Sequence, residues 1–193
     1  MESKLRSEST EVLKELKKMG FRTVMLTGDN EGAAEKVACS AGIKEWYAGV
    51  LPAEKSAVIK ELQGKYGKVA MIGDGINDAP ALSVADAGIA IGGGSPAAME
   101  SADAVLLTSN LQKTTELFKI SRATLKVCRQ NLFWAFAYNI VGIPLAAGIF
   151  AGISPLFQLP PAFCAAAMGA SSITVVLNAL RLLKMPKPQG KRD

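Results

Sequence analysis

The chain has 193 residues and carries 22 Lys and Arg against 17 Asp and Glu, a net charge of +5. Its length allows one or two domains, and the absence of His excludes His-based acid–base or metal chemistry within the sequence. Residues 1–112 hold 12 basic and 15 acidic side chains, whereas residues 113–193 hold 10 and 2. The basic balance therefore comes from the second part, where aromatic residues do not interleave with a basic patch, and we expect no nucleic-acid partner. Cys39, Cys128 and Cys164 lie too far apart for a metal cluster and are typical of reduced intracellular thiols.

Residues 1–112 alternate segments of helical periodicity with short apolar runs of strand length. In chain order we predict helix 8–19, strand 23–26, helix 31–40, a short strand near 46–50, helix 54–63, strand 68–72, helix 79–85, strand 88–91, helix 96–101 and strand 104–108. Strands that alternate with helices favour a parallel sheet with right-handed crossovers. The predicted fold class of this part is therefore an α/β parallel sheet.

The ten residues Gly73–Leu82, GDGINDAPAL, follow one of the predicted strands. Ligands of parallel sheets bind outside the carboxyl ends of the strands, where Asp74 falls. The neighbouring glycines would let a phosphate or a metal approach the backbone, and Asp74 and Asp78 offer the hard oxygen ligands that suit Mg²⁺. Asp78 can also cap the helix predicted to begin near Ala79. A capped turn with solvated acids is the alternative.

The first predicted strand ends in a second polar loop, Thr27–Asn30, with the sequence TGDN. Thr27 offers a hydroxyl and backbone N–H groups to a phosphate, and either Asp29 or Asn30 can cap the helix that follows. Lys55, near the start of its own predicted helix, could neutralise charge that develops on the phosphate. Taken singly, an ordinary strand-to-helix cap and a solvated lysine are the alternatives.

The second part of the chain indicates helices with basic flanks. We predict a helix over residues 112–130 whose five basic side chains could lie on anionic lipid or form a solvated face. Residues 132–153 and 159–180 are uncharged stretches of 22 residues, each long enough to cross a hydrocarbon core of about 30 Å. Five Lys and Arg precede this hairpin and five follow it, so the positive-inside rule predicts a multi-pass membrane protein with both termini and the sheet domain in the cytoplasm. A buried helical hairpin of a soluble protein is the alternative.

Polar residues within such stretches are costly in lipid and mark candidate ion ligands. They are Tyr138 and Asn139 in the first stretch and Met168, Ser171, Ser172, Thr174 and Asn178 in the second. The Met168 thioether is a soft ligand that selects Cu(I), and the absence of Asp and Glu from both stretches argues against Zn²⁺, Ca²⁺ or Na⁺/K⁺. Pro144 predicts a kink in the first helix. The alternative is that small and polar residues only hold the helices together.

The loops TGDN and GDGINDAPAL, with Lys55 between them, resemble the C-terminal part of a P-type ATPase, a branch of the haloacid dehalogenase-like superfamily. The matching stretch runs from about Leu5 to Leu183. The resemblance implies that Thr27 holds the phosphoryl group, that Lys55 stabilises its charge, and that Asp74 and Asp78 bind Mg²⁺. The catalytic set that it implies is Thr27, Gly28, Asp29, Lys55, Asp74, Asn77 and Asp78.

Two patterns in the second part resemble the copper(I)-transporting subclass of the heavy-metal P-type ATPases. Asn131, Tyr138-Asn139 and Pro144 look like the pattern of its penultimate helix, and Met168-x-x-Ser171-Ser172 looks like that of its last helix. The resemblance implies that Cu(I) or Ag(I) is a ligand of this part and that membrane lipid surrounds it. The implied ion ligands are Tyr138, Asn139, Met168, Ser171 and Ser172.

Two motifs of this family do not occur within the 193 residues: DKTG, whose Asp is the family nucleophile, and Cys-Pro-Cys, which copper exporters carry in an earlier helix. ATP would act through a nucleotide-binding domain outside this sequence, and an N-terminal segment in trans is a candidate partner. We therefore expect the chain alone neither to hydrolyse ATP nor to pump. We also expect the sheet to show a gap or an exposed edge where the strand with the nucleophile would lie.

The implied function is a Cu(I)-translocating ATPase that couples ATP hydrolysis, through an aspartyl-phosphate, to transport across a membrane. Two alternatives are a non-catalytic membrane protein that binds metal or a partner, and a membrane-tethered phosphatase of the haloacid dehalogenase type. The predicted organisation is a partial phosphorylation domain over residues 1–112, a basic connecting helix over 113–131, a transmembrane helical hairpin over 132–183 and a basic cytoplasmic tail over 184–193.

Overall fold

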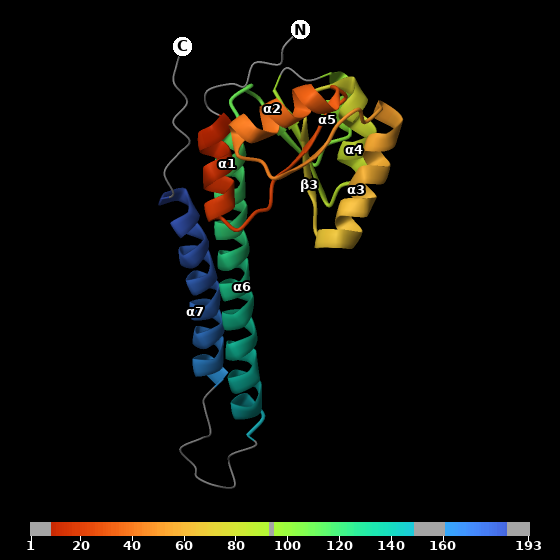
Figure 1. Ribbon diagram of the computed structural model, residues 1–193. Coiled ribbons are helices and arrows are strands. Elements are labelled where there is room, and N and C mark those ends of the chain that lie inside the picture. The colour runs from red at the N-terminus through yellow and green to blue at the C-terminus, as the bar shows by residue number, and fades with distance from the viewer. Residues whose placement is uncertain (1–8, 93–94, 149–160, 185–193) are drawn as a thin grey trace. The chain divides into compact units, whose positions relative to one another are not determined.

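The computed structural model of the protein describes residues 9–92, 95–148 and 161–184 (Figure 1). The chain divides into two compact units, residues 1–116 and residues 117–193. The first unit holds the strands and the short helices. The second unit holds one long helix completely and most of another.

The first unit has the predicted alternation of helices and strands. Its elements are α1 (Ser9–Lys18), β1 (Val24–Leu26), α2 (Glu31–Ala41), β2 (Glu45–Tyr47), α3 (Pro52–Tyr66), β3 (Ala70–Gly73), the 3₁₀ turn η1 (Ile76–Asp78), α4 (Ala79–Val84), β4 (Ala87–Ile91), α5 (Pro96–Glu100) and β5 (Ala104–Leu106). Helix α3 extends beyond the predicted range 54–63 at both ends. It starts earlier because Pro52 suits a first helical turn and because the Leu51 N–H donates to the Glu54 carboxylate at 3.0 Å.

All strand pairs are parallel, as predicted, but the strands form two sheets. β1 pairs with β2, where Val24 lies opposite Glu45. β3, β4 and β5 form the second sheet, where Ile72 lies opposite Ile89. Within the described part of the chain, β1 and β3 share no backbone hydrogen bond. The predicted gap in the sheet is therefore confirmed, and it lies between β1 and β3.

Helix α4 is central to the packing around the second sheet. It contacts β3, β4, α3 and α5, and its Leu82 is fully buried, as are Ile59 of α3 and Ile89 of β4. The backbone of β4 passes so close to α4 that a Cβ at Gly88 would stand 2.5 Å from the Leu82 carbonyl oxygen. Glycine at position 88 is therefore required by the contact between β4 and α4.

Hydrogen bonds of the Asp86 side chain connect the start of β3 to the turn between α4 and β4. Its carboxylate accepts hydrogen bonds from the Val69 N–H and from Gln63 Nε2, each at 3.0 Å, and from Lys68 Nζ at 2.5 Å. These contacts, with the Lys68 ammonium as the largest, lower the pKa of Asp86 from 3.8 to about 2. The folded chain thus favours the ionised form of this carboxyl.

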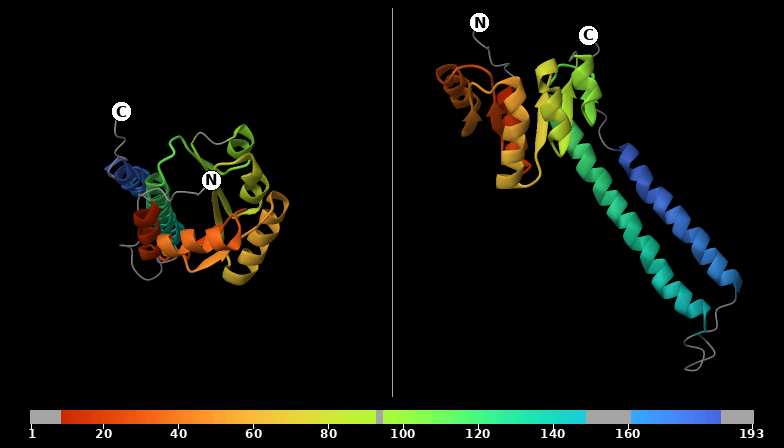
Figure 2. Two further views of the ribbon diagram at one scale, coloured as in Figure 1. Left: turned by 45° about the horizontal axis from the view of Figure 1, so that its top comes forward. Right: turned by 90° about the vertical axis from the view of Figure 1, so that its right-hand side faces the viewer.

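The second unit contains residues 117–146 of α6 (Gln112–Ala146), together with α7 (Pro161–Leu180) and the short 3₁₀ turn η3 (Arg181–Lys184). Residues 117–146 and α7 run side by side in opposite directions (Figure 2). Asn178 Nδ2 of α7 donates to Asn131 Oδ1 of α6 at 2.8 Å and to Gln130 Oε1 at 3.3 Å. This cluster fixes the register of the two helices.

The basic helix predicted for 112–130 continues without a break into the first uncharged stretch, but the helix ends at Ala146 and not at residue 153. Pro144 is accommodated inside it. Gly148 then adopts a φ of +70°, and its N–H donates to the Leu145 carbonyl at 3.1 Å, which closes the last turn. Residues 149–160 and the tail from 185 lie outside the described residues. Over the residues that are described, no helix combines the length and the apolar character needed to cross a membrane.

Substitution at two glycines tests the packing of α4. We expect Gly88→Ala to lower the free energy of unfolding by about 1–3 kcal/mol, because the new methyl group meets a backbone carbonyl that has no room to move. Gly64→Ala is the matched control in α3, where nothing lies within 4 Å, and it should stabilise by about 0.5–1 kcal/mol. Urea unfolding, monitored by hydrogen exchange of first-unit peptides, measures the free energy of unfolding of both variants. Equal effects would contradict the assigned contact.

Asp86→Asn tests the pH dependence of stability. A folded-state pKa of about 2, below the ordinary 3.8, means that the contribution of Asp86 is present above about pH 4 and is lost as the pH falls through about 2. We expect Asp86→Asn to unfold at lower urea concentration than the unmodified chain at pH 6 and the difference to shrink towards pH 2.5. A difference that is the same at both pH values would count against the carboxylate contacts described above.

Candidate functional site

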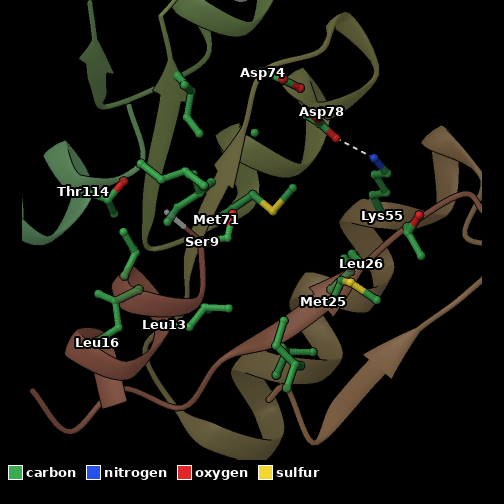
Figure 3. Close-up of a pocket in the computed structure, with 18 of the residues that line it drawn as sticks. Ser9, Leu13, Leu16, Met25, Leu26, Lys55, Met71, Asp74, Asp78 and Thr114 are labelled. Atoms are coloured by element: carbon green, nitrogen blue, oxygen red, sulfur yellow. Dashed lines mark hydrogen bonds and ion pairs between the residues drawn. The ribbon is translucent and has the colours of Figure 1, made fainter. Parts of the chain in front are cut away.

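A cavity of about 520 Å³ lies between the two sheets of the first unit (Figure 3). Its walls come from α1, β1, β3 and the first residues of α6. Thr27 follows β1 and Asp74 follows β3, so the carboxyl ends of both strands open on the same space. Lys55 and Asp78 also line it. The fold thus brings together four side chains that the sequence analysis selected from three separate segments.

Lys55 and Asp78 form an ion pair at the edge of the cavity, with Nζ 2.5 Å from Oδ1 (Figure 3). Both side chains are largely buried, with exposed fractions of 15% and 12%. The second carboxylate oxygen, Oδ2, accepts a hydrogen bond from the Gly75 N–H at 3.2 Å. The prediction that Asp78 caps α4 is wrong, because its side chain makes no hydrogen bond to that helix and both of its oxygens are engaged elsewhere.

Gly73 is required by the position of Asp78. A Cβ at residue 73 would stand 2.8 Å from Asp78 Cβ and 2.9 Å from Asp78 Oδ2. From the sequence, this glycine was expected to leave room for a phosphate or a metal. The structure gives it a different role, which is to let the end of β3 pass beside the buried carboxylate.

Asp74 and Asn77 are exposed beside this pair. Among the described residues, the structure records no side-chain partner for the Asp74 carboxylate, while its carbonyl accepts from the Ser95 N–H at 3.3 Å. Asn77 does not line the cavity, whereas Gly28, at the end of β1, does. Asp74 is therefore the carboxylate of this edge that is open to a cation.

The Thr27 hydroxyl is held by its own loop. It donates to Asp29 Oδ2 and accepts from the Asp29 N–H, both at 3.1 Å. The Thr27 backbone N–H donates to the Tyr47 carbonyl of β2 at 3.0 Å, so this one N–H of the loop is engaged within the fold. Asn30, and not Asp29, caps α2, since its Oδ1 accepts from the Ala33 N–H at 2.9 Å.

One hydroxyl, one ammonium and two carboxylates therefore meet at the open end of a cavity whose walls are otherwise mainly apolar. Lys55 compensates Asp78, which leaves Asp74 as the uncompensated charge of the four side chains. Oxygen ligands of this kind suit a small divalent cation, and a hydroxyl beside an ammonium suits the oxygens of a phosphoryl group.

The predicted ion ligands of the second unit lie on its two helices. Tyr138 and Asn139 are exposed on α6, and the ring of Tyr138 lies 6.1 Å from that of Trp134. Ser171 of α7 is half-buried and Ser172 is exposed. The side chain of Met168 lies outside the part of the chain that the structure describes.

Sequence reasoning missed Thr114, at the start of α6. It is fully buried and lines the cavity, and its hydroxyl has no hydrogen-bond partner among the described residues. The neighbouring Thr115 hydroxyl, by contrast, donates to the Gln112 carbonyl at 2.8 Å. Nothing in the sequence separates these two threonines, because the place of Thr114 in the cavity wall is set by the fold.

Comparison with known proteins identifies relatives over nearly the whole chain. Residues 1–86 match the haloacid dehalogenase-like hydrolase family. The chain is 45% identical over 185 residues to a copper-exporting P-type ATPase of Legionella pneumophila and 49% identical over 181 residues to one of Staphylococcus epidermidis. These matches cover 96% and 94% of the chain but 25% and 22% of the relatives. The chain thus spans about a quarter of the length of the curated relatives it matches.

The fold matches as well. A crystal structure of a zinc-transporting PIB-type ATPase in the E2.Pi state is 36% identical, with a TM-score of 0.80, and the match covers 94% of this chain and 28% of that chain. In sequence and fold the chain is therefore similar to about a quarter of these metal-transporting P-type ATPases, and residues 1–86 are similar to the haloacid dehalogenase-like hydrolases.

Proposed function

We propose that the first unit is part of the phosphoryl-transfer site of a metal-transporting P-type ATPase, in which an aspartate outside residues 1–193 receives the phosphoryl group from ATP. The observation that carries this proposal is the Lys55–Asp78 ion pair, which lies with Thr27 and Asp74 on one cavity at the carboxyl ends of β1 and β3. This edge of a parallel sheet is where ligands bind in open α/β folds.

The roles follow from the contacts. Lys55 is fixed by Asp78 and can stabilise negative charge on the phosphoryl oxygens without reorganising. The Thr27 hydroxyl is oriented by Asp29 and can donate to a phosphoryl oxygen when it leaves that carboxylate. Gly28 gives access at the end of β1, and the exposed amide of Asn77 borders the acidic turn. No residue of this set other than Asp74 and Asp29 offers an exposed carboxylate.

The residues present fit a bound Mg²⁺. Asp74 has an exposed carboxylate with no recorded side-chain partner among the described residues, and it lies beside the largely buried Asp78. Asp74 would be the principal ligand. Asp78 could bind the ion only if one of its oxygens gave up its contact with Lys55 Nζ or with the Gly75 N–H. When bound, Mg²⁺ would neutralise charge on the transferred phosphoryl group.

We further propose Cu(I), with Ag(I) as a chemical equivalent, as the transported substrate. Seven residues separate Asn131 from Tyr138 on α6, and seven separate Ser171 from Asn178 on α7. Because the Asn131–Asn178 hydrogen bond sets the register of these antiparallel helices, Tyr138 and Ser171 stand at a similar level, about 10 Å from it. Asn139, Met168 and Ser172 belong to the same region, and the Met168 thioether favours Cu(I).

A membrane location for α6 and α7 is part of this proposal. Both helices expose large apolar side chains, which supports contact with lipid. These exposed side chains include Leu132, Phe133, Trp134, Phe136, Ile140, Val141 and Ile143 on α6, and Ile173, Val176, Leu177 and Leu180 on α7. Phe133 packs edge to face on Trp134, with ring centroids 5.5 Å apart, and aromatic rings of this kind are common at lipid–water interfaces. The basic flanks favour a cytoplasmic side for both termini and for the first unit.

Phosphoenzyme formation tests the proposed function. We expect no acid-stable phosphoenzyme from the chain with radiolabelled ATP and Mg²⁺, and its appearance when a segment carrying DKTG, the nucleotide domain and the Cys-Pro-Cys helix is added. Lys55→Met should slow phosphoenzyme formation by about 10²-fold, because it removes the fixed positive charge that stabilises the negative charge developing on the phosphoryl group. Lys60→Met, an exposed lysine of the same helix, is the control and should leave the rate unchanged.

Cu(I) with a thiol reductant should stimulate the reconstituted reaction, and Zn²⁺ should not. Phosphorylation of the chain alone would place the nucleophile within residues 1–193 and contradict the proposed division of the site. Equal rates for Lys55→Met and Lys60→Met would remove Lys55 from the phosphoryl site, and stimulation by Zn²⁺ alone would replace Cu(I) as the substrate.

The ion pair also makes a prediction about stability. Lys55→Met leaves the Asp78 carboxylate largely buried without its cation, and we expect the free energy of unfolding to fall by roughly 3 kcal/mol. Adding Asp78→Asn should recover part of this loss, because the neutral amide needs no counter-charge and can still accept from the Gly75 N–H. Hydrogen exchange of first-unit peptides in urea measures the cycle. Additive effects of the two substitutions would show that the pair contributes no coupling.

A further inference from the structure

We propose that the second unit carries a binding site for the headgroups of anionic phospholipids. The site consists of Lys126 and Arg129 of α6 with Arg181 and Lys184 of η3, and these four side chains are called the basic belt below. The inference rests on the membrane location in the proposed function and deepens it, because it names the class of lipid that this unit selects.

The first observation is the charge of the second unit. Residues 117–192 contain nine Lys and Arg and no Asp or Glu. The four side chains of the basic belt are exposed. Among the described residues the structure records no ion pair for any of them. The unit holds no carboxylate that could neutralise the belt, and a surface of this kind attracts an anionic partner.

The second observation is that the basic belt occupies one level of the helix pair. The hydrogen bond from Asn178 Nδ2 of α7 to Asn131 Oδ1 of α6, at 2.8 Å, sets the register of these antiparallel helices (Figure 2). Counting along each helix from this bond places all four belt residues on the same side of it, within roughly 10 Å. The belt is therefore about as thick as the headgroup region of one leaflet, roughly 5–8 Å.

The third observation is that the belt continues into an apolar surface on the same face of α6. Six exposed residues recur at alternating spacings of four and three, so they share one helix face: Arg122, Lys126, Arg129, Phe133, Phe136 and Ile140. The change from basic to apolar falls within one turn, between Arg129 and Phe133. A phospholipid has the same order of groups, since its charged phosphate is joined to apolar acyl chains.

Other partners fit less well. Leu125 and Leu183 lie at the level of the belt with exposed fractions of 55% and 74%. A solvated helix face carries polar residues at such positions, whereas a lipid interface accommodates leucines among cations. An acidic segment of another protein would satisfy the charges but not the apolar surface that extends from Phe133 to Ile140. Charge and apolar surface together therefore favour an anionic lipid.

The test uses the fluorescence of Trp134, which is left as the only tryptophan of the full chain by Trp46→Phe. Trp134 is exposed and lies five residues beyond Arg129 on α6. The chain is reconstituted in phosphatidylcholine vesicles that contain a minor fraction of phosphatidylglycerol or of phosphatidylcholine with brominated acyl chains, which quench tryptophan on contact. We expect roughly tenfold stronger association of the brominated phosphatidylglycerol at low salt, because each basic side chain near the surface attracts an anionic headgroup. The preference should shrink as salt screens the charges.

Two double variants with the same net charge locate the site. Lys126→Gln combined with Arg129→Gln should reduce the preference for phosphatidylglycerol from about tenfold to about twofold, because half of the basic belt is removed. Lys14→Gln combined with Lys17→Gln removes two exposed charges from α1 and should leave the preference unchanged. Quenching by brominated phosphatidylcholine should be the same in both variants, which controls for retained contact of α6 with lipid.

Equal quenching by the two brominated lipids, or an equal loss of preference in the two double variants, would overturn the site while the membrane location stands. Loss of the preference on addition of inorganic phosphate would assign the belt to a free anion. Displacement of brominated phosphatidylglycerol by a soluble oligoglutamate peptide would assign the belt to an acidic protein.

The same measurement separates this site from the proposed function. No quenching of Trp134 by either brominated lipid would contradict the membrane location and the lipid site together. If phosphatidylglycerol is preferred but the reconstituted chain forms no phosphoenzyme, the lipid site stands and the proposed phosphoryl-transfer function fails.

Discussion

The Lys55–Asp78 ion pair joins two halves of the first unit whose sheets share no backbone hydrogen bond among the described residues. Lys55 stands at the start of α3, after the β1–β2 sheet, and Asp78 stands after β3 of the other sheet. The packing of α3 against α4 supports the same connection. The largely buried charge pair therefore positions the lysine and, together with the packing of α3 against α4, links the two halves across the gap.

In this arrangement Asp74 and Asp78 have different roles. Asp78 is committed to the protein through Lys55 and Gly75, and Gly73 makes room for it, whereas Asp74 faces outward. Two carboxylates four residues apart are thus chemically different, because one neutralises a fixed cation and the other can meet a mobile one. Under the proposed function, the same separation would let Asp74 bind a divalent ion without loss of the ion pair.

The sequence was sufficient to predict the alternation of strands and helices and the parallel pairing, because these depend on local apolar runs and turn glycines. The gap was expected only from the resemblance to a family whose DKTG motif does not occur in the 193 residues. It was misleading where tertiary contacts compete with local ones. Asp78 has the position of a helix cap, but Lys55, distant in sequence, takes its carboxylate. Thr114 shows no sequence signal at all.

The hydrogen bond between Asn131 and Asn178 has a mechanical consequence. Sliding one helix past the other by a single turn, about 5.4 Å, would separate the two side-chain amides and break their hydrogen bond. Gln130 Oε1 of α6, which accepts from Asn178 Nδ2 at 3.3 Å, adds a second contact across the same two helices. The two helices of the second unit thus resist sliding along their axes. A change of the crossing angle about the Asn131–Asn178 hydrogen bond is the easier deformation.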